Sequence, residues 1–270
     1  MILNAKKYLF LVLALVCTTG ISAINKSLSA TSPEDTFTAM IPLGSSTIEA
    51  TFTITDKTND EVMIGFDNFF YEADVISPTL PGSDSQIGEG EYKTAIDKSA
   101  QGKLTIPATV TDENGKTYTV TGIANHAFAE CTGLTRISIP NTIKDIDTFA
   151  FYQCTGLTGL KVNIANPLSV LSSTFEGSYT DTKLFVPRGS LQAYSSAEYW
   201  KLFDPIYEFP TGDVNMDGLV NIQDVVATIS YMLGEPTEPF EEIFADMNND
   251  DSINITDVIA IVNIILGEEE

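Results

Sequence analysis

The chain has 270 residues, of which 43% are hydrophobic, enough to build packed cores in two or three small domains. Its formal net charge of −23 argues against nucleic acid and anionic membrane as partners. The acidity is concentrated at the C-terminal end, since the segment from Asp213 onward has seven Asp, seven Glu and no Lys or Arg.

Residues 1–23 have the order of a secretory signal peptide. Two lysines precede a short apolar stretch from Tyr8 to Val16, and small residues follow, so we expect cleavage after Ala23. A lipoprotein signal at Cys17 is the less favoured alternative, because bulky residues precede it. The apolar stretch is too short for a comfortable membrane span, and we expect no transmembrane segment after cleavage.

Residues 24–100 form a segment that we expect to be rich in β-structure. The stretch IEATFTIT, from Ile48 to Thr55, alternates apolar and polar residues as a strand does. GFDNFFYEADV is β-prone and aromatic, whereas Ser77 to Glu91 is rich in Pro, Gly and Ser and is typical of a loop. Four aromatic residues here provide either a sugar-stacking platform or, more commonly, core side chains: Phe66, Phe69, Phe70 and Tyr71.

Two later segments align without gaps at an offset of 23 residues. TGIANHAFAECTGLTRISIP begins at Thr121, and KDIDTFAFYQCTGLTGLKVN begins at Lys144. The matched positions are Ile123/Ile146, Ala127/Ala150, Phe128/Phe151, Cys131/Cys154, Leu134/Leu157, Ile137/Leu160 and Ile139/Val162. Because one such unit cannot bury its apolar side chains alone, the fixed period predicts stacked units in a short solenoid.

Weaker copies of the strand end flank these two units, at Leu104–Pro107 and Leu184–Pro187. Two β-prone runs around Asn114-Gly115 predict a hairpin inserted between them. Within the strands we expect Ile137, Ile139, Leu160 and Val162 to face the core. The alternate residues Arg136, Ser138, Gly159 and Lys161 should face outward, where a ligand of the repeats would bind.

The pattern IxxxAFxxCxxLxxIxIP resembles the BspA-like leucine-rich repeats of secreted bacterial proteins, and the resemblance covers about Lys103 to Phe209. The ending KLFVPRGSLQAYSSAEYWKLF resembles the terminal unit of that family. The resemblance implies a leucine-rich-repeat domain at 101–209 and a role in adhesion or protein–protein contact. The ligand, whether a surface, a glycan or a protein, is left open.

Cys131 and Cys154 are expected to be buried and unbridged, because free Cys behaves as a small apolar residue. A disulfide between neighbouring units stays open as the alternative. His126, the single histidine, occupies the place of Phe149 and is expected to pack at an edge rather than to act as a catalytic base.

Two acidic loops follow, each leading into an apolar run, and the second lies 33 residues after the first. Counted from Asp213 and from Asp246, both place oxygen donors at positions 1, 3, 5, 7, 9 and 12, the ligand spacing of a calcium loop. The donors of the first loop are Asp213, Asn215, Asp217, the Leu219 carbonyl, Asn221 and Asp224. Those of the second are Asp246, Asn248, Asp250, Ser252, Asn254 and Asp257.

Gly218 at position 6 permits the sharp bend of the first loop, whereas Asp251 replaces it in the second. Asp tolerates left-handed backbone, so we expect the second loop to close with lower affinity. The alternative is a pair of polar turns that bind no metal. Five side-chain donor positions, matched twice, favour two Ca²⁺ ions.

Both loops carry Asp at position 12, and the short segment between the two predicted helices contains Pro236 and Pro239. This combination resembles a dockerin, the two-loop module that attaches a secreted protein to a cohesin, over Gly212 to the C-terminus. In that family, loop positions 10 and 11 and the following helix select the partner. Here these positions are Ile222-Gln223 and Ile255-Thr256, so a familiar cohesin is not assumed.

The helix after the second loop has an apolar arc wider than one core stripe. We expect Val258, Ile261, Val262 and Ile265 to face the core. The residues expected to supply a partner-binding face are Ile222, Tyr231, Ile255 and Ile264, and the near-repeat allows two binding orientations. In the alternative, the helices cover each other or the repeats cover them.

The fold class we predict is multidomain and mainly β. It comprises a leader at 1–23, a β-rich segment at 24–100, a leucine-rich-repeat solenoid at 101–209 and a small all-α dockerin at 210–270. The favoured function is a secreted or cell-surface binding protein, not an enzyme, whose dockerin joins a cohesin-like partner in a calcium-dependent way. An accessory or carbohydrate-binding subunit of an extracellular polysaccharide-degrading complex is the alternative, and an intramolecular calcium clamp on the repeats is a third.

Overall fold

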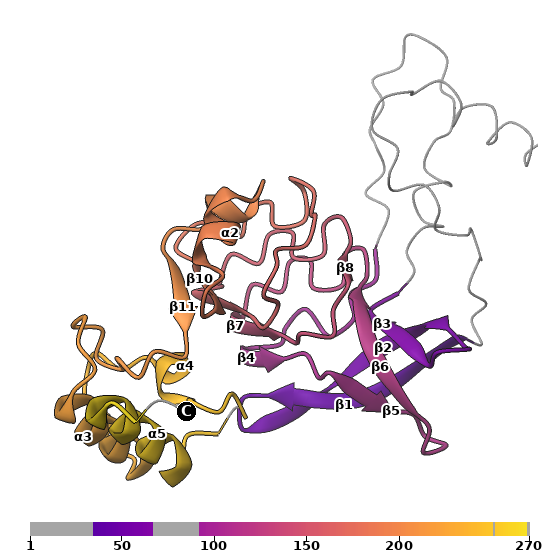
Figure 1. Ribbon diagram of the computed structural model, residues 1–270. Coiled ribbons are helices and arrows are strands. Elements are labelled where there is room, and N and C mark those ends of the chain that lie inside the picture. The colour runs from indigo at the N-terminus through magenta and orange to yellow at the C-terminus, as the bar shows by residue number, and fades with distance from the viewer. Residues whose placement is uncertain (1–34, 67–91, 251, 269–270) are drawn as a thin grey trace, which may run out of the picture. The chain divides into compact units, whose positions relative to one another are not determined.

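The computed structural model describes residues 35–66, 92–250 and 252–268. Over these residues the protein is rich in sheet and has few helices (Figure 1). The strands are β1 Thr36–Leu43, β2 Ser46–Asp56, β3 Glu61–Ile64, β4 Gly102–Thr105, β5 Thr109–Thr111, β6 Thr117–Ile123, β7 Leu134–Ile139, β8 Asp145–Ile146, β9 Gly159–Val162, β10 Lys183–Pro187 and β11 Ile206–Phe209. They run in the order β11-β10-β9-β7-β4-β1-β2-β3-β6-β5, and β8 pairs with β6.

The 23-residue offset seen in the sequence appears as strand register. In the parallel pair β7 and β9, Ile137 lies opposite Leu160 and Ile139 lies opposite Val162. In the parallel pair β6 and β8, Ile123 lies opposite Ile146. Each apolar position therefore lies beside its own copy, and all seven predicted pairs are buried.

A column of stacked phenylalanines forms the centre of this core. The Phe128 and Phe151 ring centroids are 5.4 Å apart, and Phe175 continues the column 5.2 Å beyond Phe151. Phe175 belongs to a third unit, which sequence comparison missed because its offset is 24 rather than 23. Ser178 stands there in the place of Cys154, and its hydroxyl donates to the Phe151 carbonyl over 2.6 Å.

The weaker strand copies hold the places predicted for them. β4 pairs in parallel with β7 and places Leu104 opposite Ile137, and β10 pairs in parallel with β9 and places Leu184 opposite Leu160. The hairpin predicted around Asn114-Gly115 joins β5 to β6. Its turn is held by the Asp112 carboxylate, which accepts from the backbone N–H groups of Asn114 and Lys116.

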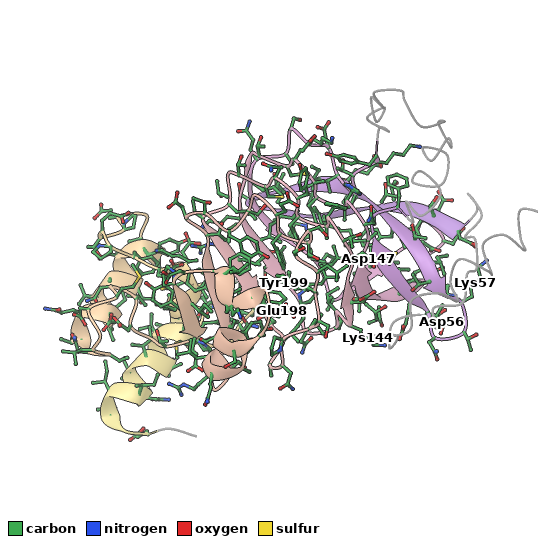
Figure 2. The ribbon with its side chains drawn as sticks, turned by 90° about the horizontal axis from the view of Figure 1, so that it is seen from above. Asp56, Lys57, Lys144, Asp147, Glu198 and Tyr199 are labelled. Carbon is green, nitrogen blue, oxygen red and sulfur yellow. The ribbon has the colours of Figure 1, made fainter. Side chains whose placement is uncertain are left out.

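The N-terminal strands extend the same sheet. The predicted strand at Ile48–Thr55 lies within β2, which pairs with β1 and β3 on its two sides. β1 meets β4 at the pair Leu43 and Leu104, and β3 runs parallel to β6. At the β2–β3 turn, labelled at Asp56 and Lys57 in Figure 2, the Asp56 carboxylate accepts from the Thr58 N–H over 2.7 Å.

Cys131 and Cys154 are buried and free, as predicted. Burial raises the pKa of each thiol to about 12, and the Cys154 thiol donates to the Phe128 carbonyl over 3.0 Å. His126 is also a packing residue, because its ring stacks between those of Tyr92 and Phe149 at centroid distances of 4.2 and 4.9 Å. Burial lowers the pKa of His126, which favours the neutral ring.

The helices of the described residues are short and lie late in the chain. Leu191–Ser196 (α2) and Trp200–Leu202 (η3) follow β10, and α4 is a single turn at Glu242–Ala245. The longer helices are α3 at Ile222–Met232 and α5 at Ile255–Leu266, which pack side by side (Figure 1).

Some expectations lie outside the described residues. These are the leader at 1–23, the aromatic residues Phe69, Phe70 and Tyr71, the loop at 77–91 and the position-6 residue Asp251. Phe66 is described and is partly buried. Across the part of the chain that the structure describes, no helix is long and apolar enough to cross a bilayer.

Candidate functional site

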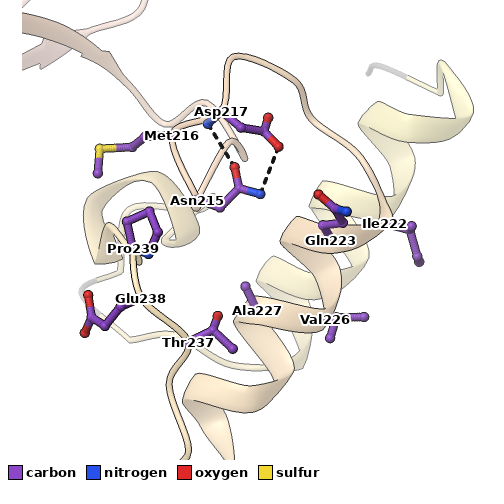
Figure 3. A pocket seen from close by; sticks show the side chains of 10 residues that line it. All are labelled: Asn215, Met216, Asp217, Ile222, Gln223, Val226, Ala227, Thr237, Glu238 and Pro239. Carbon is purple, nitrogen blue, oxygen red and sulfur yellow. Dashed lines mark hydrogen bonds between the residues drawn. The ribbon is translucent and has the colours of Figure 1, made fainter.

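In the first acidic loop, side-chain oxygens accept hydrogen bonds from backbone N–H groups of the same loop. The two carboxylate oxygens of Asp213 accept from the N–H groups of Asp217 and Gly218, over 3.1 and 3.0 Å. The Asp217 N–H also reaches the Asn215 side-chain oxygen over 2.9 Å, and the Asn215 amide donates to the Asp217 carboxylate (Figure 3). The side-chain oxygens predicted as metal ligands at positions 1, 3 and 5 therefore lie close together.

The donor at position 12 returns to the start of the loop. The Asp224 carboxylate is fully buried and accepts from the N–H groups of Val214 and Asn221 over 2.9 and 2.8 Å. Asn221 at position 9 caps α3 by accepting from the Gln223 N–H over 2.8 Å. The two side chains form a capping box, so the residues that start the helix are also the residues predicted to close the loop.

The second loop repeats this geometry. The buried Asp257 carboxylate accepts from the N–H groups of Met247 and Asn254 over 2.8 and 2.9 Å, and Asn254 caps α5. Asn248 and Asp250 repeat the side-chain pair of positions 3 and 5 at 2.8 Å. Position 4 has left-handed backbone in both loops, with φ of 57° at Met216 and 59° at Asn249.

The donor chemistry fits calcium. Calcium takes roughly six to eight oxygen ligands, carboxylates mixed with amide and backbone carbonyls, and both loops supply that mixture at matching positions. Among the described residues, no three acidic, histidine or cysteine side chains cluster in a way that could hold a metal by themselves. A site here would therefore depend on amide and carbonyl oxygens as well as carboxylates.

A pocket opens beside the first loop. It is lined by Asn215 and Asp217 of the loop, by the start of α3 at Ile222, and by the segment from Thr237 to Pro239 (Figure 3).

The second loop has different surroundings. The amide of Asn249 donates to the Asn163 side-chain oxygen over 3.0 Å, just after β9. Two loops with one sequence pattern therefore have different neighbours.

Both helices expose apolar side chains at equivalent positions. The matched pairs, 33 residues apart, are Ile222 and Ile255, 64% and 60% exposed, Val226 and Ile259, 55% and 53% exposed, and Leu233 and Leu266, 75% and 65% exposed. Val258 and Ile261 face the core as predicted, but Ile265 is 39% exposed. The helical wheel placed Ile265 toward the core, but so small a module covers only part of the apolar arc of α5.

Of the four predicted partner-binding residues, the structure exposes Ile222 and Ile255. Tyr231 and Ile264 are half-buried. The Tyr231 ring stacks on Phe240 at a centroid distance of 4.7 Å, and burial raises its pKa. Val226, Ile259, Leu233 and Leu266 are exposed positions that the sequence reasoning did not select, although the same 33-residue offset links them.

The outward strand residues do not face solvent, and this corrects the expectation from strand alternation. Ser138 and Lys161 are buried, and so is Gly159. Arg136 Nη1 lies 2.9 Å from Glu241 Oε1, and Lys161 Nζ lies 3.4 Å from Asp246 Oδ2. Lys103 on β4 pairs with Glu242, although its side chain is 47% exposed. The Arg136 and Lys161 side chains point away from the repeat core, as alternation requires, but acidic residues of the C-terminal segment cover them.

Apolar contacts accompany the ion pairs. The Phe244 ring lies 5.8 Å from both Phe185 of β10 and Tyr207 of β11. Phe185 and Phe209 belong to one buried cluster with Val225, Val258 and other residues of the C-terminal helices. The strand face and the C-terminal segment therefore share a core.

Comparison with known families gives two matches. Residues 116–197 match the model described as BspA type Leucine rich repeat region, and residues 211–266 match that of the Dockerin type I domain. No curated protein matches the chain. A solved leucine-rich repeat protein from Bacteroides capillosus is similar over 63% of this chain and 99% of its own, at 23% identity and a TM-score of 0.38.

Proposed function

Because the chain carries BspA-type leucine-rich repeats and a C-terminal dockerin type I domain, we propose that it is a secreted, non-catalytic binding protein attached to a cohesin-bearing partner. A dockerin type I domain implies a cohesin partner, and leucine-rich repeats imply a binding role. In this proposal, residues 101–209 form a short solenoid that binds a surface, a glycan or a protein. Residues 210–270 form a small all-α module that anchors it.

The main support for the proposal is that one arrangement of an acidic loop and its following helix occurs twice. Each loop places matching oxygen donors around a turn, caps its helix with Asn, and presents exposed apolar residues on that helix. We propose that each loop holds one Ca²⁺, through Asp213, Asn215, Asp217, the Leu219 carbonyl, Asn221 and Asp224 in the first. The second would use Asp246, Asn248, Asp250, Ser252, Asn254 and Asp257.

Calcium supplies the positive charge that these loops need. Several carboxylates in one loop repel one another without metal, so binding free energy becomes folding free energy of the module. Isothermal titration of the full chain should show two sites. Asp224→Ala and Asp257→Ala should each remove one site, and a protein that takes up no calcium would contradict the proposal.

The matched apolar residues on α3 and α5 are the proposed docking face. Exposed apolar patches mark interaction surfaces, and these side chains, each more than half exposed, recur at equivalent positions on the two helices. Because the two halves are related by a repeat, we expect a partner to bind in either of two orientations. Ile222 and Ile255 belong to this face, and Tyr231 and Ile264 stay predicted members that border it.

The test is surface plasmon resonance of the full chain against a broad panel of purified cohesins, in calcium and in chelator. We expect at least one cohesin to bind, and only in calcium. The double variant Val226→Asp and Ile259→Asp should weaken that binding by at least 100-fold, because a charge would be buried in each binding orientation.

Met40→Asp is the matched control, since Met40 is 59% exposed on β1, far from both helices in the sequence. It should bind as the unmodified chain does. Failure of every cohesin, or equal binding in chelator, would contradict the proposed function.

A further inference from the structure

The two acidic loops differ at their first donor. In the first loop, both Asp213 oxygens accept from backbone N–H groups of the same loop. In the second, Asp246 Oδ1 accepts from the Asp250 N–H over 3.0 Å, while Oδ2 lies 3.4 Å from the ammonium of Lys161 on β9. The second loop therefore has a cation of the repeat region at a donor that calcium would use.

This cation is fixed in place. β9 pairs with β7 on one side and with β10 on the other, so the Lys161 backbone is held in the middle of the sheet. The Lys161 ammonium also lies 5.3 Å from the centroid of the Phe209 ring. Both side chains of the ion pair are only 6% exposed, which makes screening by solvent and salt weak.

The charge of Lys161 has opposite effects on the two states of the loop. Without calcium, the ammonium compensates the buried Asp246 carboxylate, which would otherwise be costly to bury. With calcium at Asp246, the same ammonium lies next to a divalent cation and repels it. Lys161 therefore favours the calcium-free form of the second loop, and no lysine is paired with the corresponding Asp213 in the described ion pairs.

We propose that Lys161 is a built-in counter-ion of the second loop, which lowers the calcium affinity of that loop and couples calcium binding to the contact between the dockerin and the repeat strands. This inference rests on the proposed calcium sites. Coupling between binding equilibria is reciprocal, so calcium in the second loop should loosen the Lys161–Asp246 contact by the same factor.

The test isolates the second loop in the full chain. Asp213→Ala with Asp217→Ala silences the first loop, and calcium affinity is then measured by isothermal titration with and without Lys161→Gln. Gln keeps a hydrogen-bond donor near Asp246 but removes the charge. We expect calcium to bind about tenfold more tightly to the Gln variant, within the usual range of coupling between sites.

Two controls separate charge from shape. Lys161→Arg keeps the charge and should leave the affinity unchanged. Arg136→Gln removes a cation of the same strand face whose partner, Glu241, is not a calcium ligand, and it should also leave the affinity unchanged. An unchanged or weaker affinity in Lys161→Gln would overturn the proposal.

Thermal unfolding gives a second readout. A merely structural role for Lys161 would lower the melting temperature of Lys161→Gln equally with and without calcium. The proposed role makes the loss larger without calcium, because the Asp246 carboxylate then has neither the Lys161 ammonium nor calcium beside it. Equal losses in the two conditions would contradict it.

If Lys161→Gln does not fold, the unmodified chain decides the question. By reciprocity, calcium should raise the rate at which Lys161 is acetylated relative to Lys98, whose partner Glu130 lies outside the C-terminal module. A constant or lower rate would overturn the proposal. Absence of any calcium binding would instead show that the proposed function is wrong, so the two failures are distinguishable.

Discussion

The repeat region and the C-terminal module are each built from near-copies of one sequence unit, but the chemistry that holds the copies differs. In the repeats, one turn bonds to the next through backbone groups, such as the Phe128 N–H to the Ala150 carbonyl over 2.8 Å. In the module, each loop satisfies its own N–H groups with carboxylates, chiefly Asp224 and Asp257. The first arrangement is neutral, whereas the second gathers negative charge.

The two regions should therefore respond differently to calcium. A neutral core of stacked apolar side chains has no use for calcium, so its stability should be the same with and without it. Loops closed by buried carboxylates should gain stability whenever a cation joins them.

The largest effect is expected from Phe151→Ala. The Phe151 side chain is fully buried and stacks between Phe128 and Phe175, so its removal leaves a cavity. We expect a loss of about 3–5 kcal/mol in the free energy of unfolding. Urea denaturation should give the same loss in calcium and in chelator, and Met40→Ala on the surface should change stability by less than about 0.5 kcal/mol. A loss of stability that calcium restores would contradict the independence of the repeat core from calcium.

Next comes Asp224→Ala in the first loop. The substitution removes a proposed ligand and leaves buried N–H groups without an acceptor, at a cost of about 2–3 kcal/mol. Gly218→Ala should cost about 1 kcal/mol, because φ of 88° strains any residue with a side chain while the space around it is open. Calcium titrations followed by circular dichroism should rank the two variants in that order. The reverse ranking would contradict the role of Asp224.

Arg136→Ala tests the contact between the two regions. It leaves the Glu241 carboxylate, 6% exposed, without its guanidinium and removes a cation 5.5 Å from the Phe185 ring centroid. We expect a loss of about 2 kcal/mol, because a buried charge loses its partner. Exposed Lys98, paired with Glu130, is the matched control, and Lys98→Ala should cost less than about 1 kcal/mol. Equal losses would show that the strand face is not covered in solution.

The smallest effect at neutral pH concerns the cysteines. Their pKa is raised by burial from 9.0 to about 12, so the neutral thiol is the form the fold prefers. Below about pH 9 the thiols are neutral in both states, and the folded protein keeps its full stability. As the pH rises from 9 toward 12, the unfolded chain loses its thiol protons first, so the free energy of unfolding falls. Replacing both residues with Ala should therefore flatten the loss of stability in that window. Iodoacetamide should label neither thiol in the folded protein at pH 8, and rapid labelling would contradict their burial.

The sequence predicted the repeat core well, because each apolar position recurs at a constant offset. Ile137 and Leu160 lie in register since the same residue type recurs at the same place in each unit. Phe175 and Ser178 were not predicted as repeat positions, because one inserted residue breaks the 23-residue period and a hydroxyl replaces the thiol. The two acidic loops could be found in the sequence for a similar reason, because the proposed ligands of one loop lie within twelve consecutive residues.

Contacts between distant segments could not be predicted. Lys161 and Asp246 are 85 residues apart, and nothing periodic links them. Strand alternation gave the direction of the Lys161 side chain correctly, but not what covers it. Tyr231 likewise has an apolar position on the helical wheel, and only the structure shows that Phe240 stacks against it.

Amide hydrogen exchange of the full chain tests whether calcium organises the module while the repeat core is independent of it. Mass spectrometry in calcium and in chelator compares both regions in one sample. We predict that chelation raises exchange in α3 and α5 at least tenfold and leaves β6 and the turns around Phe128 and Phe151 unchanged. Loss of protection in the repeat core together with the helices, or no change in either region, would contradict a calcium dependence confined to the module.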